Sequence, residues 1–269
     1  MTDPLDRIAA ALERLSPPPP PPADPRAHPA YVWRQGALVP VRNFAPLPLA
    51  MLIGVERQKA ALLDNLRHLA GGYAAQDVLL WGARGTGKSA LVKSAVGSLQ
   101  QGRADGDLAL VEVSDLSGLA GLFAALAPID RAFVVFVDDL GFDVPAEARA
   151  LRSMLEGGAE PRPGNVRLVV TANRRHLAPR DIAEQESAIN PRDSADDHLA
   201  LADRFGLSLG FHALDQDGYL EIVAAYAKAN DLAFEPGAAI EWATRRGSRS
   251  GRVAWQFIID SAGRAGKAL

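Results

Sequence analysis

The strongest constraint on the fold is a glycine-rich segment that lies between an apolar run and a helical pattern. Residues 82–89 read GARGTGKS and match the spacing G-x-x-x-x-G-K-[ST]. The preceding run, Val78–Trp81, is short and apolar like a buried strand, and helical periodicity begins at Lys88. Glycines let backbone N–H groups turn around phosphate oxygens, and the start of the following helix adds a positive dipole. The segment therefore predicts a phosphate-binding loop.

The residues of this loop have distinct expected roles toward a nucleotide. We expect the Lys88 ammonium to reach the β- and γ-phosphates and the Ser89 hydroxyl to ligate Mg²⁺. The loop and the first helical turn are predicted to supply the remaining contacts, at Gly82, Arg84, Gly85, Thr86, Gly87 and Ala90. The predicted cofactors are therefore ATP and Mg²⁺.

A second apolar run ends in two acidic residues. Phe133–Val137 leads directly into Asp138 and Asp139, in the pattern called Walker B. A buried strand of this kind directs a carboxylate at the metal beside a phosphate loop, so Asp138 is predicted to hold Mg²⁺ through water. Asp139 is placed to orient or deprotonate the attacking water. The alternative interpretation is an ordinary turn after a strand.

Strand-like runs alternate with helical patterns as far as Phe211. The predicted strands are 78–81, 108–113, 133–137, 167–171 and 207–209, and the predicted helices are 55–69, 88–99, 116–126 and 146–156. This alternation is typical of a parallel sheet covered by helices. The later pattern is helical only, at 217–230, 236–246 and 252–263. We predict an α/β nucleotide-binding domain over 51–211 and a small helical domain over 212–269.

The first fifty residues are predicted to hold a helix and a linker. Asp3 and Pro4 resemble an N-cap and a first helical residue, and apolar residues then recur at helical spacing, which predicts an amphipathic helix over 1–16. The six prolines of Pro17–Pro22 favour polyproline II, so residues 17–50 are interpreted as a proline-rich linker. A docking segment for an aromatic groove is the alternative.

The composition narrows the function only broadly. The chain has 269 residues, a formal net charge of −3 and no cysteine, which excludes disulfides and thiolate metal sites. That charge, with no recognisable nucleic-acid-binding motif, does not indicate a nucleic-acid partner. No apolar run approaches the roughly 18–20 residues of a membrane span. The N-terminus lacks the basic-then-apolar order of a secretion signal, so we expect a cytoplasmic protein.

Four further segments resemble elements of AAA+ ATPases. The run VVTAN, ending at Asn173, resembles sensor 1, whose polar residue helps to position water beside the γ-phosphate. LADRFG, with Arg204, resembles the stretch that carries the arginine finger, which reaches the nucleotide of a neighbouring subunit. SGRVA, with Arg252, resembles sensor 2 of the lid domain. Upstream, LIGVE resembles the segment that contacts adenine, which implies a binding role for Ile53 and Gly54.

Each of these residues also has a simpler interpretation. Asn173 can cap the turn after its strand, and Arg204 can be a surface or ion-pairing residue. Arg246 and Arg249 are alternatives to Arg252 for the sensor 2 role.

The whole pattern over residues 51–269 resembles the AAA+ family. The motifs VDDLGF, MLEGG, PRPGNV and LADRFGLSLGF together resemble an uncharacterised bacterial AAA+ group, domain-of-unknown-function family 815. The resemblance implies a P-loop NTPase parallel-sheet sandwich with a C-terminal helical lid. It further implies an ATPase that works as a homo-oligomeric ring or arc and moves an unknown client.

The second acidic position leaves an alternative function open. Many AAA+ proteins have glutamate where this chain has Asp139, which is one methylene shorter, so a nucleotide-gated binding or scaffold module with negligible hydrolysis is the alternative. Asp-Asp is the usual pattern of the resembled group, which commonly has glutamate at the position of Asp143. Asp143 is therefore a second candidate for the residue that orients water.

Overall fold

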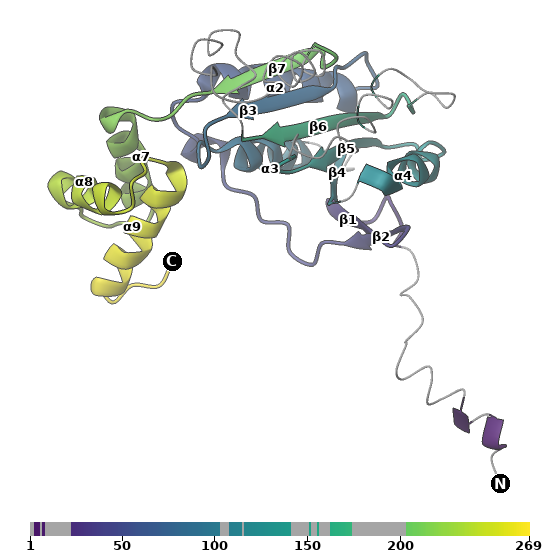
Figure 1. Cartoon of the computed structure of the whole chain (residues 1–269), viewed down its shortest axis with the longest axis horizontal. Helices are drawn as coiled ribbons and strands as arrows, with labels where there is room; N and C mark the ends of the chain where they lie inside the picture. Colours follow the sequence, from purple (N-terminus) through teal and green to yellow (C-terminus); the bar gives the residue numbers. More distant parts are fainter. Residues whose placement is uncertain are drawn as a thin grey trace, which may run out of the picture.

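The computed structural model consists of an α/β body and a helical lid (Figure 1). It describes residues 3–5, 7–8, 23–102, 108–114, 116–140, 151, 155, 162–173 and 203–269. Most of the predicted helix over 146–156 and most of the predicted helix over 1–16 lie outside these ranges. At the described start of the chain, the Asp3 carboxylate accepts a hydrogen bond from the Leu5 N–H at 2.9 Å, as an N-cap does.

A seven-stranded sheet forms the centre of the described body, in the order β2-β1-β4-β5-β6-β3-β7. Its strands are β1 (Ala30–Arg34), β2 (Ala37–Pro40), β3 (Val78–Gly82), β4 (Leu108–Val113), β5 (Ala132–Val137), β6 (Val166–Ala172) and β7 (Leu207–Phe211). Neighbouring strands are parallel except for the antiparallel pair β1–β2. Because parallel strands end at the same edge, the segments after β3, β5 and β6 meet there.

Helices cover both faces of the sheet (Figure 1). The body helices are α2 (Glu56–Ala70), α3 (Lys88–Gln101) and α4 (Leu119–Leu126), with short 3₁₀ turns η1 (Leu49–Met51) and η2 (Leu116–Gly118). Strand β5 is buried at every residue, and its side chains alternate between the α4 core and the α2–α3 core. Because both faces of the sheet are buried, the sequences of the parallel strands are continuous apolar runs.

The lid has a hydrophobic core of its own. It consists of α7 (Gln216–Ala229), α8 (Pro236–Arg245) and α9 (Gly251–Arg264), packed around side chains such as Tyr219, Val223 and Ile258. Each helix begins at a capped residue: the side chains of Asp215, Glu235 and Ser250 accept hydrogen bonds from the first turns of α7, α8 and α9. None of the described helices combines the length and the apolar character that crossing a membrane would require.

The predicted α/β sheet and the helical C-terminal segment are confirmed, but part of the predicted linker belongs to the sheet. Residues 30–40, placed within the linker over 17–50, form the β1–β2 hairpin, and β1 pairs with β4. Gln35 and Gly36 have φ angles of 52° and 77°, the left-handed values that a two-residue hairpin turn uses. Tyr31 and Trp33 are buried, so apolar burial outweighs the proline-rich composition of the segment.

A network of hydrogen bonds fastens the chain before β1 to the body. The Tyr31 hydroxyl donates to the Asp24 carbonyl at 2.6 Å and accepts from the His28 N–H at 2.8 Å. The Arg131 guanidinium donates to the carbonyls of Pro25 and His28 at 2.8 and 2.9 Å. Residues 24–28, which precede the hairpin, therefore belong to the body.

This network predicts a specific loss of stability. The variant Tyr31→Phe is expected to lower the free energy of unfolding by about 1–3 kcal/mol, because it leaves the Asp24 carbonyl and the His28 N–H without the hydroxyl. Urea denaturation would measure the change. The matched control is Tyr73→Phe, at a side chain with 71% exposure, for which a change within about 0.5 kcal/mol is expected. Equal effects of the two variants would contradict the role given to Tyr31.

Candidate functional site

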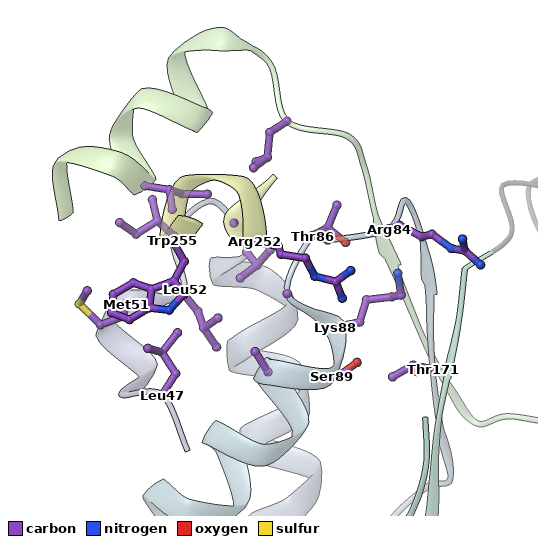
Figure 2. Close-up of a pocket in the computed structure, with 18 of the residues that line it drawn as sticks. Leu47, Met51, Leu52, Arg84, Thr86, Lys88, Ser89, Thr171, Arg252 and Trp255 are labelled. Atoms are coloured by element: carbon purple, nitrogen blue, oxygen red, sulfur yellow. The ribbon is translucent and has the colours of Figure 1, made fainter. Parts of the chain in front are cut away.

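A pocket of about 550 Å³ lies where the carboxyl edge of the sheet meets the lid (Figure 2). One end is polar and is formed by the loop between β3 and α3 and by the ends of β5 and β6. The other end is apolar and is formed by the segment around η1 and by α7 and α9 of the lid. A cavity with this division suits a ligand with a charged part and a flat apolar part.

The loop between β3 and α3 wraps around the Lys88 side chain. The Lys88 ammonium is buried, and its Nζ donates to the carbonyl oxygens of Gly82 and Ala83 at 3.0 and 2.7 Å. Positive φ angles of 128°, 75° and 93° at Gly82, Gly85 and Gly87 produce the turn, and Gly87 is the residue that caps α3. The loop therefore has the backbone shape expected of a phosphate cradle.

The charge of Lys88 is balanced by the carboxylates across the pocket. Burial lowers the pKa of the Lys88 ammonium below its usual value. Asp139 and Asp138 oppose this shift by favouring the charged form, and Arg84 adds to the lowering. A phosphate group placed between Lys88 and Arg84 would act in the same direction as the two carboxylates.

The acidic pair after β5 is held by side chains from two neighbouring elements. Oδ1 of Asp138 accepts hydrogen bonds from the Ser89 hydroxyl and from the Thr171 hydroxyl, each at 2.6 Å. Asp139 has a left-handed φ of 53°, its N–H donates to Thr171 Oγ1 at 2.8 Å, and its Oδ1 accepts from the Asn173 side-chain amide. The structure thus brings together the predicted residues Ser89, Asp138, Asp139 and Asn173.

The polar end of the pocket suits a hard divalent cation. A hydroxyl and a carboxylate, from Ser89 and Asp138, meet there, and both are oxygen donors of the kind that Mg²⁺ prefers. Within the described ranges, no three His, Cys, Asp or Glu side chains form a cluster that would enclose a metal. A site with few protein donors is typical of Mg²⁺ that is bound together with substrate phosphates.

The lid touches the phosphate loop directly at Gly85. The Gly251 N–H, in the first turn of α9, donates to the Gly85 carbonyl at 3.1 Å. A Cβ at Gly85 would lie 2.7 Å from the Cβ of Ser250, so glycine is required by space as well as by its φ. The next residue, Arg252, lines the pocket and extends towards the phosphate loop in Figure 2.

The apolar end contains residues that the motifs did not single out. Leu47, Met51 and Leu52 line it from the body, and Tyr226 and Trp255 line it from the lid (Figure 2). The rings of Tyr226 and Trp255 meet edge to face with centroids 5.5 Å apart. The available signal for Trp255 is its spacing, because it lies three residues after Arg252 and so shares a helix face with it.

The pocket includes most of the predicted site residues. Those that line it are Ile53, Arg84, Gly85, Thr86, Gly87, Lys88, Ser89, Ala90, Asp138, Asp139, Asn173 and Arg252. Gly82 contributes its carbonyl behind the loop. Gly54 and Arg204 are not among the described lining residues, and Asp143 lies outside the described residues.

Arg204 lies near the edge of the sheet opposite the edge that carries the phosphate loop of its own chain. It precedes β7, which runs parallel to β3 from the pair Val78–Leu207 to the pair Gly82–Phe211. The phosphate loop follows the carboxyl end of β3, so the length of a strand, about 15 Å, separates the two. The half-buried Arg204 is therefore placed away from its own pocket.

Comparison with solved structures finds similar chains of low sequence identity. Thermotoga maritima RuvB, a Holliday junction branch migration motor, has a TM-score of 0.51 at 20% identity, over 83% of this chain and 68% of that chain. Aeropyrum pernix ORC1, solved in complex with DNA, has a TM-score of 0.49 at 15% identity, over 80% and 63% of the two chains. The likeness to RuvB shows the fold of AAA+ P-loop ATPases.

Sequence comparison identifies the family. Curated proteins provide no match to this sequence. The family described as "Protein of unknown function (DUF815)" matches residues 26–265, which is most of the chain and covers both body and lid. The resemblance drawn from the motifs is thereby confirmed. The chain belongs to the DUF815 family, and its fold is that of the AAA+ P-loop ATPases.

Proposed function

We propose that this protein binds ATP with Mg²⁺ and hydrolyses it to drive motion between body and lid, as a homo-oligomer acting on an unknown client. One observation carries the proposal: a buried lysine, a hydroxyl–carboxylate pair and a lid arginine line a single pocket, at Lys88, Ser89, Asp138 and Arg252. The volume of about 550 Å³ is in the range of nucleotide-sized sites.

Each polar residue has a role that follows from its position. Lys88 exchanges its two carbonyl partners for phosphate oxygens, which compensate its burial more strongly because they are charged. Ser89 and Asp138 hold Mg²⁺, which when bound neutralises charge that develops on the phosphates. Arg252 contacts the nucleotide from the lid. The apolar wall that contains Leu52 and Trp255 receives the base.

We assign the positioning of the water that attacks the γ-phosphate to Asp139 and Asn173. Both side chains line the polar end of the pocket, and the Asn173 amide donates to the Asp139 carboxylate. A carboxylate oriented by an amide at this position is suited to align water and accept its proton.

Arg204 is assigned to the nucleotide of a neighbouring subunit. Its place at the far end of β7 keeps it from the phosphates of its own chain. A guanidinium supplied by a neighbour stabilises charge that develops during phosphoryl transfer. Hydrolysis then depends on assembly, which links ATP turnover to the oligomeric state.

A second candidate function is a nucleotide-gated binding module that retains ATP with negligible hydrolysis. The specific observation in its favour is the hydrogen bond from Asn173 to Asp139, which occupies one oxygen of the candidate base. In this case the nucleotide would fix the position of the lid, and exchange of the nucleotide would release it.

Removal of the Lys88 ammonium is expected to weaken ATP binding. The variant Lys88→Ala should raise the Kd for ATP by about 10–100-fold, because charge-assisted bonds to phosphate contribute roughly 1.5–3 kcal/mol. Isothermal titration calorimetry would measure the Kd. Lys93→Ala is the matched control, since Lys93 lies one turn further along α3 and pairs with Glu112 at 2.9 Å. An unchanged Kd in Lys88→Ala would refute the proposed nucleotide site.

The trans role of Arg204 predicts complementation between two inactive variants. Arg204→Ala should bind ATP normally but lose about 10³-fold in turnover, as removal of an arginine finger does. Mixed with Lys88→Ala, it should regain part of the turnover, because its intact pocket meets the intact arginine of the other subunit. Steady-state phosphate release would measure this, with circular dichroism to verify folding. Turnover unaffected in Arg204→Ala, or no recovery on mixing, would exclude the trans role.

The two candidate functions differ in the effect of Asp139. If Asp139 activates water, Asp139→Asn should reduce single-turnover hydrolysis by about 10²–10⁴-fold and leave ATP binding intact. The control Asp64→Asn changes an acid on the surface of α2, away from the described pocket lining. If wild type and Asp139→Asn both retain unhydrolysed ATP to the same extent, the binding module is the correct function.

A further inference from the structure

We propose that Thr171 is a positioning residue that holds the metal-binding carboxylate of Asp138 and the backbone of Asp139 in their working geometry. The inference rests on the proposed function, because it concerns the Mg²⁺ site of that function. Thr171 belongs to β6, and its side chain is 1% exposed.

The Thr171 hydroxyl uses both of its hydrogen-bonding capacities on the acidic pair. It donates to Asp138 Oδ1 at 2.6 Å and accepts from the Asp139 N–H at 2.8 Å. Its own carbonyl accepts from the Leu140 N–H at 2.8 Å. Three consecutive residues after β5 are therefore fixed to one residue of β6.

The two hydrogen bonds of the Thr171 hydroxyl have separate effects on Asp138 and Asp139. The Asp138 side chain is exposed at the end of a strand, so a fixed hydroxyl is required to hold its rotamer. Asp139 is held at a φ of 53°, a left-handed conformation that has an energetic cost for a residue with a side chain. Its N–H bond to Thr171 offsets part of that cost. Both bonds to Asp138 reach Oδ1.

Threonine is well suited to this position. Its branched side chain fits a buried strand and restricts χ1, so the backbone of β6 fixes the direction of the hydroxyl. Thr171 and Asn173 lie two residues apart and so point to the same face of the strand. Thr171 reaches Asp138 while Asn173 reaches Asp139, and the two carboxylates are thus held from the end of β6 and the residue that follows it.

The test compares Thr171→Ser with Thr171→Ala, which lose the same methyl group and differ only in the hydroxyl. The affinity for ATP would be measured by calorimetry with Mg²⁺ and again with EDTA. Wild type and Thr171→Ser should bind ATP more tightly with Mg²⁺. Thr171→Ala should lose about 10–100-fold of that Mg²⁺-dependent gain, as loss of a second-sphere partner does, with its affinity in EDTA changed less than twofold. Single-turnover hydrolysis should fall in Thr171→Ala and recover in Thr171→Ser.

Controls separate a positioning role from a structural one. Thr171→Val keeps the volume without the hydroxyl and should behave like Thr171→Ala. Ser94→Ala removes another buried hydroxyl, whose Oγ has no hydrogen-bond partner within the described residues, and should leave the Mg²⁺ effect unchanged. Two results would overturn the inference and leave the proposed function standing. One is the same Mg²⁺-dependent gain in ATP affinity in Thr171→Ser and Thr171→Ala. The other is a loss of ATP affinity in Thr171→Ala that is as large in EDTA as it is with Mg²⁺. Wild type that does not bind ATP overturns both.

Discussion

The Asp138 carboxylate is where three parts of the chain that are distant in sequence are joined. The hydroxyls of Ser89, from α3, and Thr171, from β6, converge on one of its oxygens at 2.6 Å. Such charge-assisted bonds are short and strong, and they hold only if β5, β6 and the start of α3 keep their relative positions. The pocket, the proposed metal donors and the pair proposed to orient water all depend on this register between strands.

The packing of the sheet supplies that register. Side chains of β5 alternate between two separate cores, one with α4 and one with α2 and α3. A shift of β5 by one residue would therefore move each of its side chains from one core into the other. Strand β4 has β1 on its outer side, because the β1–β2 hairpin extends the sheet. The strand that leads to Asp138, β5, and the strand that contains Thr171, β6, are interior strands independently of the hairpin, because β4 and β3 flank the pair.

Sequence patterns predicted the parts of this site that depend on local chemistry. The phosphate loop and the acids after β5 are read from residue type and spacing, and the parallel sheet from fully apolar runs such as 133–137. Of the apolar wall only the LIGVE segment with Ile53 was predicted, because Leu47 and Trp255 meet only when the lid lies on the body. Thr171 reads as an ordinary strand residue, and its role emerges only from its contacts with another strand.

The hairpin was missed for a different physical reason. Its strands follow a proline-rich stretch, and composition averaged over 17–50 favours a linker. The local signal was the pair Gln35–Gly36 between short runs with apolar residues, a turn that only a few residue pairs adopt. Pairing of β1 with β4 joins residues eighty positions apart, such as Ala30 and Leu110, which periodicity within either segment does not reveal.

The contact between Gly251 and Gly85 has a thermodynamic consequence. One of the N–H groups that a helix start leaves unpaired is satisfied by a carbonyl of the phosphate loop rather than by water. A ligand that binds the loop must then change the free energy with which the lid docks on it. Thermodynamic linkage requires that docking of the lid change the binding free energy of the ligand by the same amount. The docked lid acts in this sense as a ligand of the loop. A molecule that binds only the outer surface of the lid, and shifts its docking, would alter affinity in a pocket that it never enters.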